Sequence, residues 1–398
     1  MRILFVIDDK YPISGGSTRV VAQLSAGLIA NGYQVAIIAP KGSVAEHEES
    51  IIESPVLFIP FAQEGSLLYS RNVMQQALAF SPDIIHSHSE RYALNYAQKL
   101  AKKTGTKHVH TMHGNYAGIR KYYPLGQVVS IIVYLLSLSA LFRKQSKLIS
   151  FRKSVFDKTF WDNLDIRSIA QFALSADAAV TPSHYHYEHI GREAFGQTHL
   201  IPTGHSENVA VLKPFRTMTN VLSVGRVCRE KRSMVTLKAF HVACSKNLSL
   251  RLHIVGTGPH LKKLKSYVKR HKLKNTVIFY GQINEREVLK DIYTNSDVFL
   301  QSSYRFETQG LVFLEAASTG LPIIYCDDRL KVGVNEYNAI LTGPSYREIA
   351  AGLSSLTKES ELCWSKMSQA SLNEAEKWPF SNTLQSHVEL YKKLKIEL

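Results

Sequence analysis

The chain has 398 residues, of which 45% are hydrophobic and 20% charged, and its formal net charge at pH 7 is +15. This length favours two domains of about 150–200 residues each, and the composition excludes a disordered or low-complexity chain. The positive excess predicts attraction to something anionic: nucleic acid, an anionic membrane surface or a phosphorylated substrate.

The start of the chain and its cysteines indicate the compartment. A strand-like run begins at Ile3, which leaves no room for the basic and apolar regions of a secretion signal. The longest apolar stretch, residues 128–142, is shorter than the ~20 residues of a spanning helix. The cysteines form no CxxC pair, so we interpret them as reduced core residues rather than zinc ligands. They are Cys228, Cys244, Cys326 and Cys363.

The first half of the chain alternates short apolar runs with amphipathic segments. One such segment carries Val20, Leu24 and Leu28 at helical spacing and ends at Gly32. Short buried strands separated by helices are typical of an α/β protein with a parallel, doubly wound sheet. The predicted strands are residues 2–9, 35–39, 56–61, 83–88, 108–113, 178–182 and 199–202, with further helices near residues 70–80 and 91–103.

The alternation restarts after residues 206–219, a stretch of little periodicity that we interpret as a linker. We therefore predict one Rossmann-like domain at 1–205 and a second at 220–380, each binding ligands at the carboxyl ends of its strands. We expect residues 381–398 to form a helix that packs back toward the N-terminal domain. The predicted elements of the second domain are strands 220–224, 250–255, 276–280, 298–301 and 322–326 and helices 233–243, 260–271, 285–294 and 310–318.

Two strand ends of the first domain carry candidate ligand-binding residues. Gly15 and Gly16 form a strand-to-helix turn, where backbone N–H groups can approach an anion; the alternative is a plain tight turn. The pattern is not GxGxxG, which disfavours a dinucleotide site. His113 ends a strand at its carboxyl edge and is the second candidate, whereas His86 and His88 are expected to make local hydrogen bonds.

The second domain places cations and glycines after its strands. Arg226 follows Gly225 at the end of the first strand and Lys231 comes five residues later, so the two side chains can hold a diphosphate from two sides. The alternative is a solvated basic loop. Gly256 and Gly258, after the next strand, indicate backbone that is pressed close to a ligand.

The most specific segment, residues 305–322, carries two glutamates with seven residues between them. Glu307 precedes a helix that Gly310 opens, so N–H groups at the helix start can meet phosphate while a carboxylate meets sugar hydroxyls. Glu315 lies inside the helix among apolar residues, where a buried carboxylate needs a donor such as a ribose diol. The alternative is an ordinary amphipathic helix with an exposed glutamate.

With these motifs the chain resembles the retaining glycosyltransferases of family four, which have the GT-B fold of two Rossmann-like domains whose parallel sheets face a central cleft. The resemblance covers nearly the whole chain, and its specific part is the segment with two glutamates. Residues 306–311 are similar to the version in bacterial diacylglycerol glucosyltransferases, although Asn338-Ala339 stands where many relatives have Asn-Gly. The other matches are the double glycine and residues 83–88, 111–113, 180–183, 201–204, 224–226, 230–231 and 255–259, of which the first four are individually less specific.

The resemblance implies a role for each matching residue. Glu307 would contact the transferred sugar and Glu315 the nucleotide ribose. Arg226 and Lys231 would stabilise the departing diphosphate, while His113 would hydrogen-bond the sugar. No metal or other cofactor is implied, because cations and a helix dipole take that place. The other implied donor-binding residues are Gly15, Gly16, Gly256, Gly258, Gln282, Ile283, Phe306, Gln309, Gly310 and Leu311.

The acceptor side of this fold lies in the first domain, where residues 128–142 are apolar and have cations on both sides. That composition is typical of a helix lying on an anionic membrane surface, and the alternative is a core helix with a solvated rim. The predicted acceptor and membrane residues are Arg120, Lys121, Tyr122, Tyr123, Arg143, Lys144 and Lys147.

The leading hypothesis is a cytoplasmic enzyme, peripheral on the inner face of the cell membrane, that moves glucose from UDP-glucose to diacylglycerol or a related glycolipid. One alternative keeps this chemistry with a polysaccharide, teichoic acid or glycoprotein acceptor, and another is a non-catalytic GT-B subunit that binds substrate. No nucleic-acid-binding motif accompanies the basic residues, so nucleic acid is not an expected partner.

Overall fold

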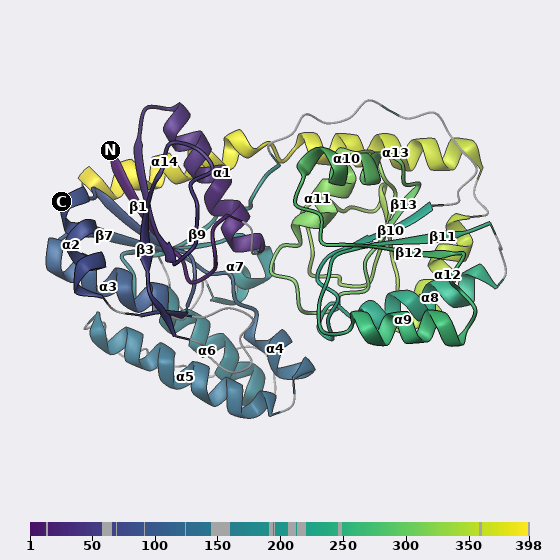
Figure 1. Ribbon diagram of the computed structural model, residues 1–398, viewed down its shortest axis with the longest axis horizontal. Coiled ribbons are helices and arrows are strands. Elements are labelled where there is room, and N and C mark those ends of the chain that lie inside the picture. The colour runs from purple at the N-terminus through teal and green to yellow at the C-terminus, as the bar shows by residue number, and fades with distance from the viewer. Residues whose placement is uncertain are drawn as a thin grey trace. The chain divides into compact units, whose positions relative to one another are not determined.

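A computed structural model of the chain describes residues 1–12, 15–57, 66–68, 70–90, 92–123, 125–144, 160–190, 194, 196–205, 212, 220–245, 249–357 and 360–396. The chain divides into two compact units (Figure 1). Unit 1 comprises Met1–Thr203 with Phe380–Leu398, and unit 2 comprises Gly204–Pro379. The predicted linker, residues 206–219, lies outside the described residues apart from residue 212.

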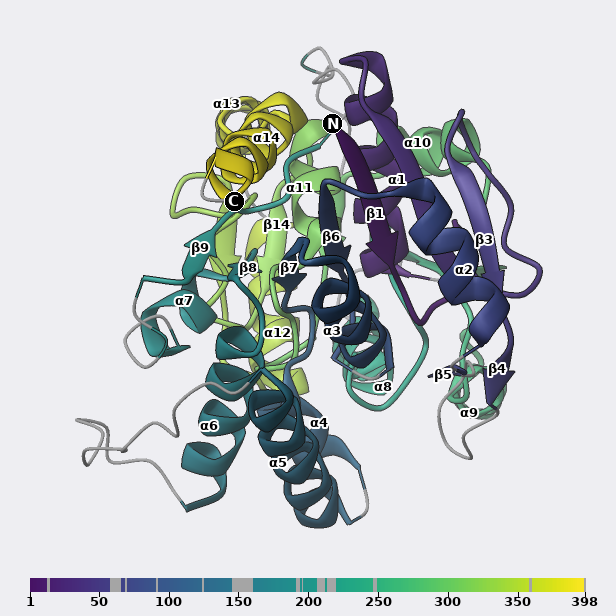
Figure 2. The ribbon, with the colours of Figure 1, turned by 90° about the vertical axis from the view of Figure 1, so that its left-hand side faces the viewer.

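Unit 1 is built on a parallel sheet with the strand order β3-β2-β1-β6-β7-β8-β9. Strand β1 lies inside the sheet, and after Arg2 it is apolar, with Ile3, Leu4 and Phe5 having no solvent exposure. A strand that is buried on both faces needs helices above and below the sheet, and Figure 2 shows them. The strands are β1 (Arg2–Val6), β2 (Gln34–Pro40), β3 (Ser50–Ser54), β6 (Ile84–Ser87), β7 (Lys107–Thr111), β8 (Ala178–Thr181) and β9 (Thr198–Leu200).

The helices of unit 1 include one from the far end of the chain. Helix α14 (Phe380–Ile396) packs so closely on α1 that a Cβ atom at Gly27 would lie 2.7 Å from the Leu384 side chain. Tyr391 is fully buried and Lys395 pairs with Asp83 at 3.0 Å, so the tail is an integral part of this unit. The other helices are α1 (Gly16–Ala30), α2 (Arg71–Phe80), α3 (Tyr92–Thr104), α4 (Tyr116–Tyr122), α5 (Gly126–Arg143), α6 (Phe160–Leu174) and α7 (His184–Ile190).

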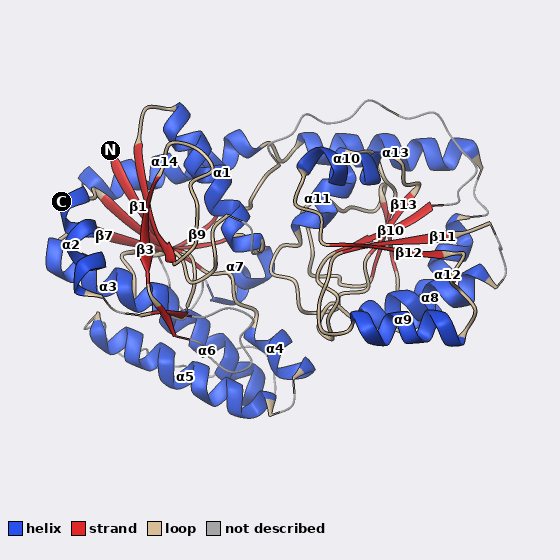
Figure 3. Cartoon of the chain, in the orientation of Figure 1, coloured by secondary structure: helices blue, strands red, loops and turns tan. Residues whose placement is uncertain are grey.

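Unit 2 repeats the architecture with a parallel sheet in the order β12-β11-β10-β13-β14-β15 (Figure 3). The strands are β10 (Asn220–Val224), β11 (Arg251–Val255), β12 (Val277–Gly281), β13 (Val298–Leu300), β14 (Ile323–Tyr325) and β15 (Ala339–Leu341). The helices are α8 (Ser233–Cys244), α9 (Leu261–Arg270), α10 (Arg286–Thr294), α11 (Leu311–Ser318), α12 (Tyr346–Leu356) and α13 (Glu361–Glu376). The predicted class, α/β with two parallel sheets, is confirmed.

One strand prediction was wrong. The sequence predicted a strand of the main sheet at residues 56–61, but Val56–Leu57 (β4) pairs antiparallel with Ser66–Leu67 (β5) outside it, and residues 58–61 are not described. The place beside β2 belongs to β3, which the sequence analysis missed. As an edge strand β3 needs little apolar sequence, and only Ile51 and Ile52 are apolar in it. All four cysteines are free, and three of them are buried.

Candidate functional site

The glycines after β10 and β11 are explained by backbone packing. A Cβ atom at Gly256 would lie 2.1 Å from the Gly225 carbonyl oxygen, and one at Gly258 would lie 2.5 Å from the Val227 oxygen. Both glycines also have positive φ angles, 127° and 155°. The sequence analysis attributed them to a close ligand, but the backbone that they approach is the neighbouring strand-end loop. The glycines therefore fix the loop that carries Arg226.

The two predicted diphosphate-binding cations are each paired with a carboxylate. Arg226 donates to Glu230, which is 1% exposed, over 2.6 Å. Lys231 Nζ lies 2.6 Å from both carboxylate oxygens of Glu307 and 5.6 Å from the centre of the Phe306 ring. The Lys231–Glu307 pair joins loops that are 76 residues apart in sequence. Arg226 and Lys231 thus lie along one recess, and each has a carboxylate partner within unit 2.

A small recess opens beside this pair at the carboxyl end of β10. Its lining includes Gly225, Arg226, Lys231, Thr236 and Gln301. Backbone groups and two cations along one recess are what an anionic ligand needs.

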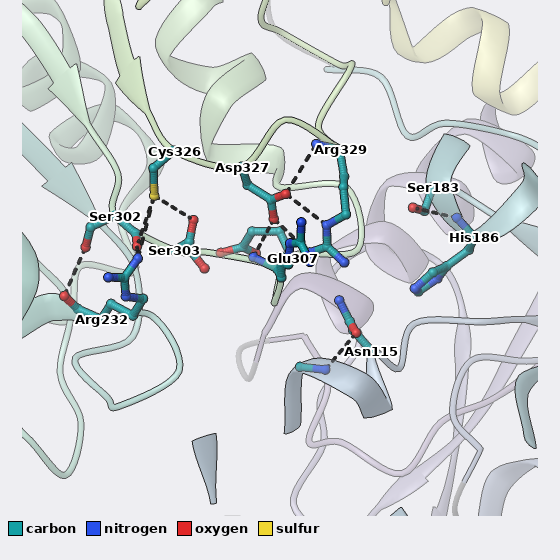
Figure 4. A network of polar contacts seen from close by, with 12 residues as sticks. Asn115, Ser183, His186, Arg232, Ser302, Ser303, Glu307, Cys326, Asp327 and Arg329 are labelled. Carbon is teal, nitrogen blue, oxygen red and sulfur yellow. Dashed lines mark hydrogen bonds and ion pairs between the residues drawn. The ribbon is translucent and has the colours of Figure 1, made fainter. Parts of the chain in front are cut away.

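The loop before α11 is held by a buried aspartate. Asp327 has no solvent exposure and accepts a hydrogen bond from the Arg305 backbone N–H at 2.7 Å. It also pairs with the Arg329 guanidinium at 2.7 Å, and Figure 4 shows the two side chains facing each other beside Glu307. Arg305 adopts a left-handed conformation with φ 54°, which a non-glycine residue keeps only when its surroundings fix it. Asp327 thus fixes the backbone at Arg305, two residues before Glu307.

Helix α11 begins where the sequence placed its start. Gly310 is the N-cap residue with φ 83°, and no side chain caps the helix there. A Cβ atom at Gly310 would lie 2.7 Å from the Phe313 ring, so glycine is required for shape as well as for φ. Gln309 is buried and Leu311 is the first helical residue. The first turn of α11 therefore lies just after Glu307, and no side chain caps its backbone N–H groups.

Glu315 has a partner that the sequence analysis missed. Its Oε2 atom accepts a hydrogen bond from the Tyr293 hydroxyl at 2.8 Å, and the side chain is partly exposed. The predicted need for a donor is thus partly met within the protein. Tyr293 is buried at the end of α10, and its position on the apolar face of that helix was the available signal.

The residues predicted after β12 lie nearer the surface. Gln282 is exposed and donates to Asn284 at 3.1 Å, while Ile283 packs against the core of unit 2. That Gln282 and Ile283 contact the nucleotide-sugar donor stays a prediction. Among the described residues no group of three or more His, Cys, Asp or Glu side chains could hold a metal ion.

In unit 1, His113 follows β7 and is held at several atoms. Its Nε2 atom lies 3.0 Å from Nδ1 of His88, and its backbone N–H donates to Glu90 at 3.1 Å. Burial lowers the pKa of His113 to about 4, so its ring is neutral at physiological pH. Gly15 is the N-cap of α1 and Gly16 its first residue, and a Cβ atom at either would meet no described residue within 4 Å. Unit 1 therefore offers an open helix start and a neutral imidazole at one sheet edge.

The cations that were predicted to face a membrane are mostly engaged in unit 1. Arg120 pairs with Asp162 and Asp165, and only 13% of its side chain is exposed. Lys144 pairs with Asp177 at 2.6 Å. Arg143 donates to Gln98 and Ser139. Arg120 thus ties α4 to α6, which does not support the predicted surface role. Lys121 and Tyr123 are exposed and Tyr122 is partly buried, while Lys147 lies outside the described residues.

Helix α5 has an apolar outer face and an inner face that combines two serines with apolar residues. The inner residues Ser130 and Ser137 are buried and donate to Asp165 and Gln171 of α6, each over 2.6 Å. The outer side chains of Val128, Ile131, Ile132, Leu135, Leu136 and Phe142 are 44–58% exposed. By length and composition α5 could cross a membrane, and 33% of it is buried in unit 1. The inner side also buries Val133 and Ala140 in an apolar cluster with Leu94 and Phe172, so α5 packs on the core of unit 1 while its outer face stays apolar and exposed.

Two family models and several known proteins match this chain. A family model described as Glycosyltransferase Family 4 matches residues 14–207, and one described as Glycosyl transferases group 1 matches residues 207–373. The α-monoglucosyldiacylglycerol synthase of Acholeplasma laidlawii is 25% identical over 345 residues, which are 81% of this chain and 80% of the relative. The enzyme of the same name from Streptococcus pneumoniae is 24% identical over 333 residues, 81% and 70% of the two chains. Among solved structures, Anabaena HepE in complex with UDP-glucose has a TM-score of 0.69 and 15% identity over 99% of this chain and all of HepE, which confirms the GT-B fold.

Proposed function

Because the chain belongs to the glycosyltransferases of family four, we propose that it moves glucose from UDP-glucose to a membrane lipid such as diacylglycerol, with retention of configuration at the anomeric carbon. Two relatives that match over 81% of the chain are named α-monoglucosyldiacylglycerol synthases, which supports both the sugar and the acceptor. The solved complex of HepE with UDP-glucose, a protein of the same fold, supports the donor.

In this proposal, different residues of unit 2 bind different parts of the sugar donor. We assign the diphosphate to Arg226, Lys231 and the open N-terminus of α11, because two cations and a helix dipole can stabilise the leaving group without a metal ion. Glu315 has Tyr293 as a fixed donor, which orients its carboxylate toward the ribose hydroxyls. Lys231 orients Glu307, which contacts the sugar hydroxyls. The Lys231–Glu307 ion pair therefore places one residue at the diphosphate and one at the sugar of the donor.

The proposed transfer breaks the bond between the anomeric carbon and the phosphate oxygen and forms a bond from the same face to the acceptor hydroxyl oxygen. The acceptor proton passes to the departing phosphate oxygen, and no protein nucleophile takes part. Positive charge develops on the sugar ring during this step. A neutral His113 can hydrogen-bond the sugar without adding repulsion, which fits its lowered pKa.

The observation that carries the lipid acceptor is the outer face of α5. Ser130 and Ser137 anchor the helix to α6, so its large apolar side chains are turned outward. A contiguous apolar face of this kind on a folded unit marks an interaction site. A helix that lies in the membrane interface with this face buried would bring unit 1 to a lipid acceptor.

The first experiment supplies the purified chain with UDP-glucose and vesicles that contain diacylglycerol, and it identifies products by mass spectrometry and NMR. An α-glucosyl lipid is the expected product. Transfer to a polysaccharide, teichoic acid or glycoprotein but to no lipid would overturn the acceptor, and a β-linked product would overturn retention. Absence of UDP release with any donor and acceptor would favour a non-catalytic binding subunit.

The second experiment tests the α5 face with Ile132→Gln and Leu135→Gln together. Burial of a whole Ile or Leu side chain contributes about 1.5–3 kcal/mol, so the exposed half of each contributes about 1 kcal/mol. Vesicle binding should fall roughly 30-fold, since 1.4 kcal/mol is a factor of ten. Leu362→Gln is the matched control, because Leu362 is 64% exposed on α13 of unit 2 and should not alter binding. Equal binding by wild type and the α5 double variant would exclude this face as the membrane contact.

A further inference from the structure

Two histidines form a direct ring-to-ring contact at the carboxyl edge of the unit 1 sheet. His88 follows β6 and His113 follows β7, and these strands are neighbours, so both residues lie at the same edge. Nδ1 of His88 is 3.0 Å from Nε2 of His113, and the rings are stacked with their centres 5.3 Å apart. His88 is buried, whereas His113 is partly exposed. The buried imidazole of His88 thus contacts the partly exposed imidazole of His113.

Both rings are neutral, so the contact is a hydrogen bond with one donor and one acceptor. Burial lowers the pKa of His113 to about 4 and holds the pKa of His88 well below its usual value. A neutral imidazole carries one proton on one of its two nitrogens, and the hydrogen bond at one nitrogen decides the state of the other. Two arrangements of the pair are therefore open.

The surroundings of His88 distinguish the two arrangements. If His113 Nε2–H donated, His88 would accept at Nδ1 and carry its proton on Nε2. That Nε2 atom is buried and has no hydrogen-bond partner among the described residues. A buried N–H without an acceptor is rarer in proteins than a buried acceptor without a donor. The arrangement in which His88 Nδ1–H donates to His113 Nε2 is therefore the more stable one.

The ring of His88 is also fixed in place. It packs edge-on against Phe5 with the centres 5.5 Å apart and against His86 at 4.1 Å. His86 is itself held at both nitrogens, by the Tyr391 hydroxyl at 2.6 Å and by Thr111 at 2.7 Å. His88 cannot turn without displacing residues of β1, β7 and α14.

We infer that His88 is a positioning residue whose Nδ1–H holds His113 in the tautomer with its proton on Nδ1, so that His113 is a hydrogen-bond donor to the hexose of the donor substrate. The contact with the hexose rests on the proposed function, whereas the tautomer of His113 follows from unit 1 alone. In the other tautomer His113 would place a lone pair at Nδ1, and a hydroxyl oxygen of the sugar would lose its donor.

The test combines a spectroscopic readout with kinetics on the full chain. Long-range ¹H–¹⁵N correlation spectra of protein with ¹⁵N-labelled histidine distinguish a protonated ring nitrogen from an unprotonated one, and loss of one signal set in His113→Gln assigns the residue. Wild type should show a proton on Nδ1 of His113. His88→Phe keeps a packed ring without the N–H, so His113 should move to the Nε2–H tautomer.

Glucosyl transfer should follow the tautomer. In His88→Phe we expect kcat to fall about 10- to 100-fold, as when the residue that orients a metal-binding histidine is removed, with little change in KM for UDP-glucose. His88→Asn retains an N–H near the position of Nδ1 and should restore both the tautomer and most of the activity. His110→Asn is the control, because His110 is fully buried and bonds through one ring nitrogen to Ser87. It should leave the tautomer of His113 unchanged and kcat within about twofold.

A wild-type spectrum with the proton of His113 on Nε2 would overturn the inference whatever the activity, and so would an unchanged tautomer in His88→Phe. If His88→Phe fails to fold, the wild-type spectrum and His88→Asn still decide. A wild type with the Nδ1–H tautomer that transfers no sugar would refute the proposed function and leave the pairing of the two histidines supported.

Discussion

The ion pair between Lys231 and Glu307 should stabilise unit 2 and also orient the donor loop, the loop before α11 that carries Glu307. Both carboxylate oxygens lie 2.6 Å from Nζ, and the Lys231 and Glu307 side chains are 20% and 8% exposed. Lys231→Met keeps most of the aliphatic stem but leaves a nearly buried carboxylate without its cation. Breaking a fully buried pair in this way costs about 3–5 kcal/mol. Because a fifth of Lys231 reaches solvent, we expect a loss of about 2–3 kcal/mol in the free energy of unfolding.

A double-mutant cycle separates the pair from its surroundings. Glu307→Gln alone leaves an ammonium group that can turn toward solvent, so it should cost less than Lys231→Met. The double variant contains no unpaired charge and should be more stable than Lys231→Met alone, with a coupling energy of about 2 kcal/mol. The assay is urea and thermal unfolding followed by tryptophan fluorescence, since Trp364 and Trp378 of the three tryptophans lie in unit 2. For a unit of this size the single variant should melt about 5–10 °C lower.

A control pair in the same unit sets the scale. Lys377 Nζ lies 2.9 Å from Glu374, but the lysine side chain is 63% exposed. Lys377→Met should therefore cost less than about 1 kcal/mol, as for other solvent-screened pairs. If the effects of Lys231→Met and Glu307→Gln simply add, or if Lys231→Met is no worse than Lys377→Met, the ion pair does not hold the donor loop and the reasoning is wrong.

Two further predictions concern single residues. Gly256→Ala should destabilise unit 2 by about 3 kcal/mol or more, because its Cβ atom would lie 2.1 Å from the Gly225 oxygen and φ is 127°; Gly105→Ala, with φ 72° and open space, should cost about 1 kcal/mol in the same thermal assay. Burial lowers the pKa of His108 to about 3, whereas a histidine in the unfolded chain has a pKa of about 6.5. Below pH 6.5 the unfolded chain therefore binds more protons than the folded one, and the free energy of unfolding decreases as the pH is lowered. From pH 6.5 to pH 5 this residue should cost unit 1 roughly 1.5 kcal/mol, and urea midpoints that fall equally in wild type and His108→Asn would contradict the assignment.

The parts of the fold that the sequence predicted best are those with local causes. β1 and β10 were identified from short apolar runs, which a parallel sheet buries on both faces. The start of α11 followed from Gly310, whose φ of 83° few other residues would adopt. The order of strands in each sheet, and the place of β3 at an edge, depend on pairing between distant segments and leave little trace in a single sequence.

The partners of the site residues could not be predicted for the same reason. The sequence identified Lys231 and Glu307 as separate candidates, but their pairing spans 76 residues. Tyr293 is separated from Glu315 by 22 residues, on a different helix. Cations that look available in the sequence are thus balanced by carboxylates that only the fold brings near them.

Helix α5 shows how a composition can leave two opposite structures open. Its mean apolarity fits a core helix and a membrane-surface helix equally well, and the outcome depends on which side faces α6. Ser130 and Ser137 are seven residues apart, two helical turns, so they lie on one face. A stripe of small polar residues on an apolar helix was the available signal. Their hydrogen bonds to Asp165 and Gln171 turn this side of α5 toward α6.

The same contacts change what we expect of membrane binding. The sequence suggested that cations around α5 draw the protein to anionic lipid, but Arg120 is balanced by two aspartates and Lys144 by Asp177. The described rim of α5 therefore adds little net charge, and the apolar outer face should supply most of the binding energy. Electrostatic attraction weakens as the Debye length falls from about 10 Å at 0.1 M salt to about 3 Å at 1 M, whereas apolar burial does not. We expect vesicle co-sedimentation to fall less than about threefold over that range, and a loss of tenfold or more would assign the binding to charge instead.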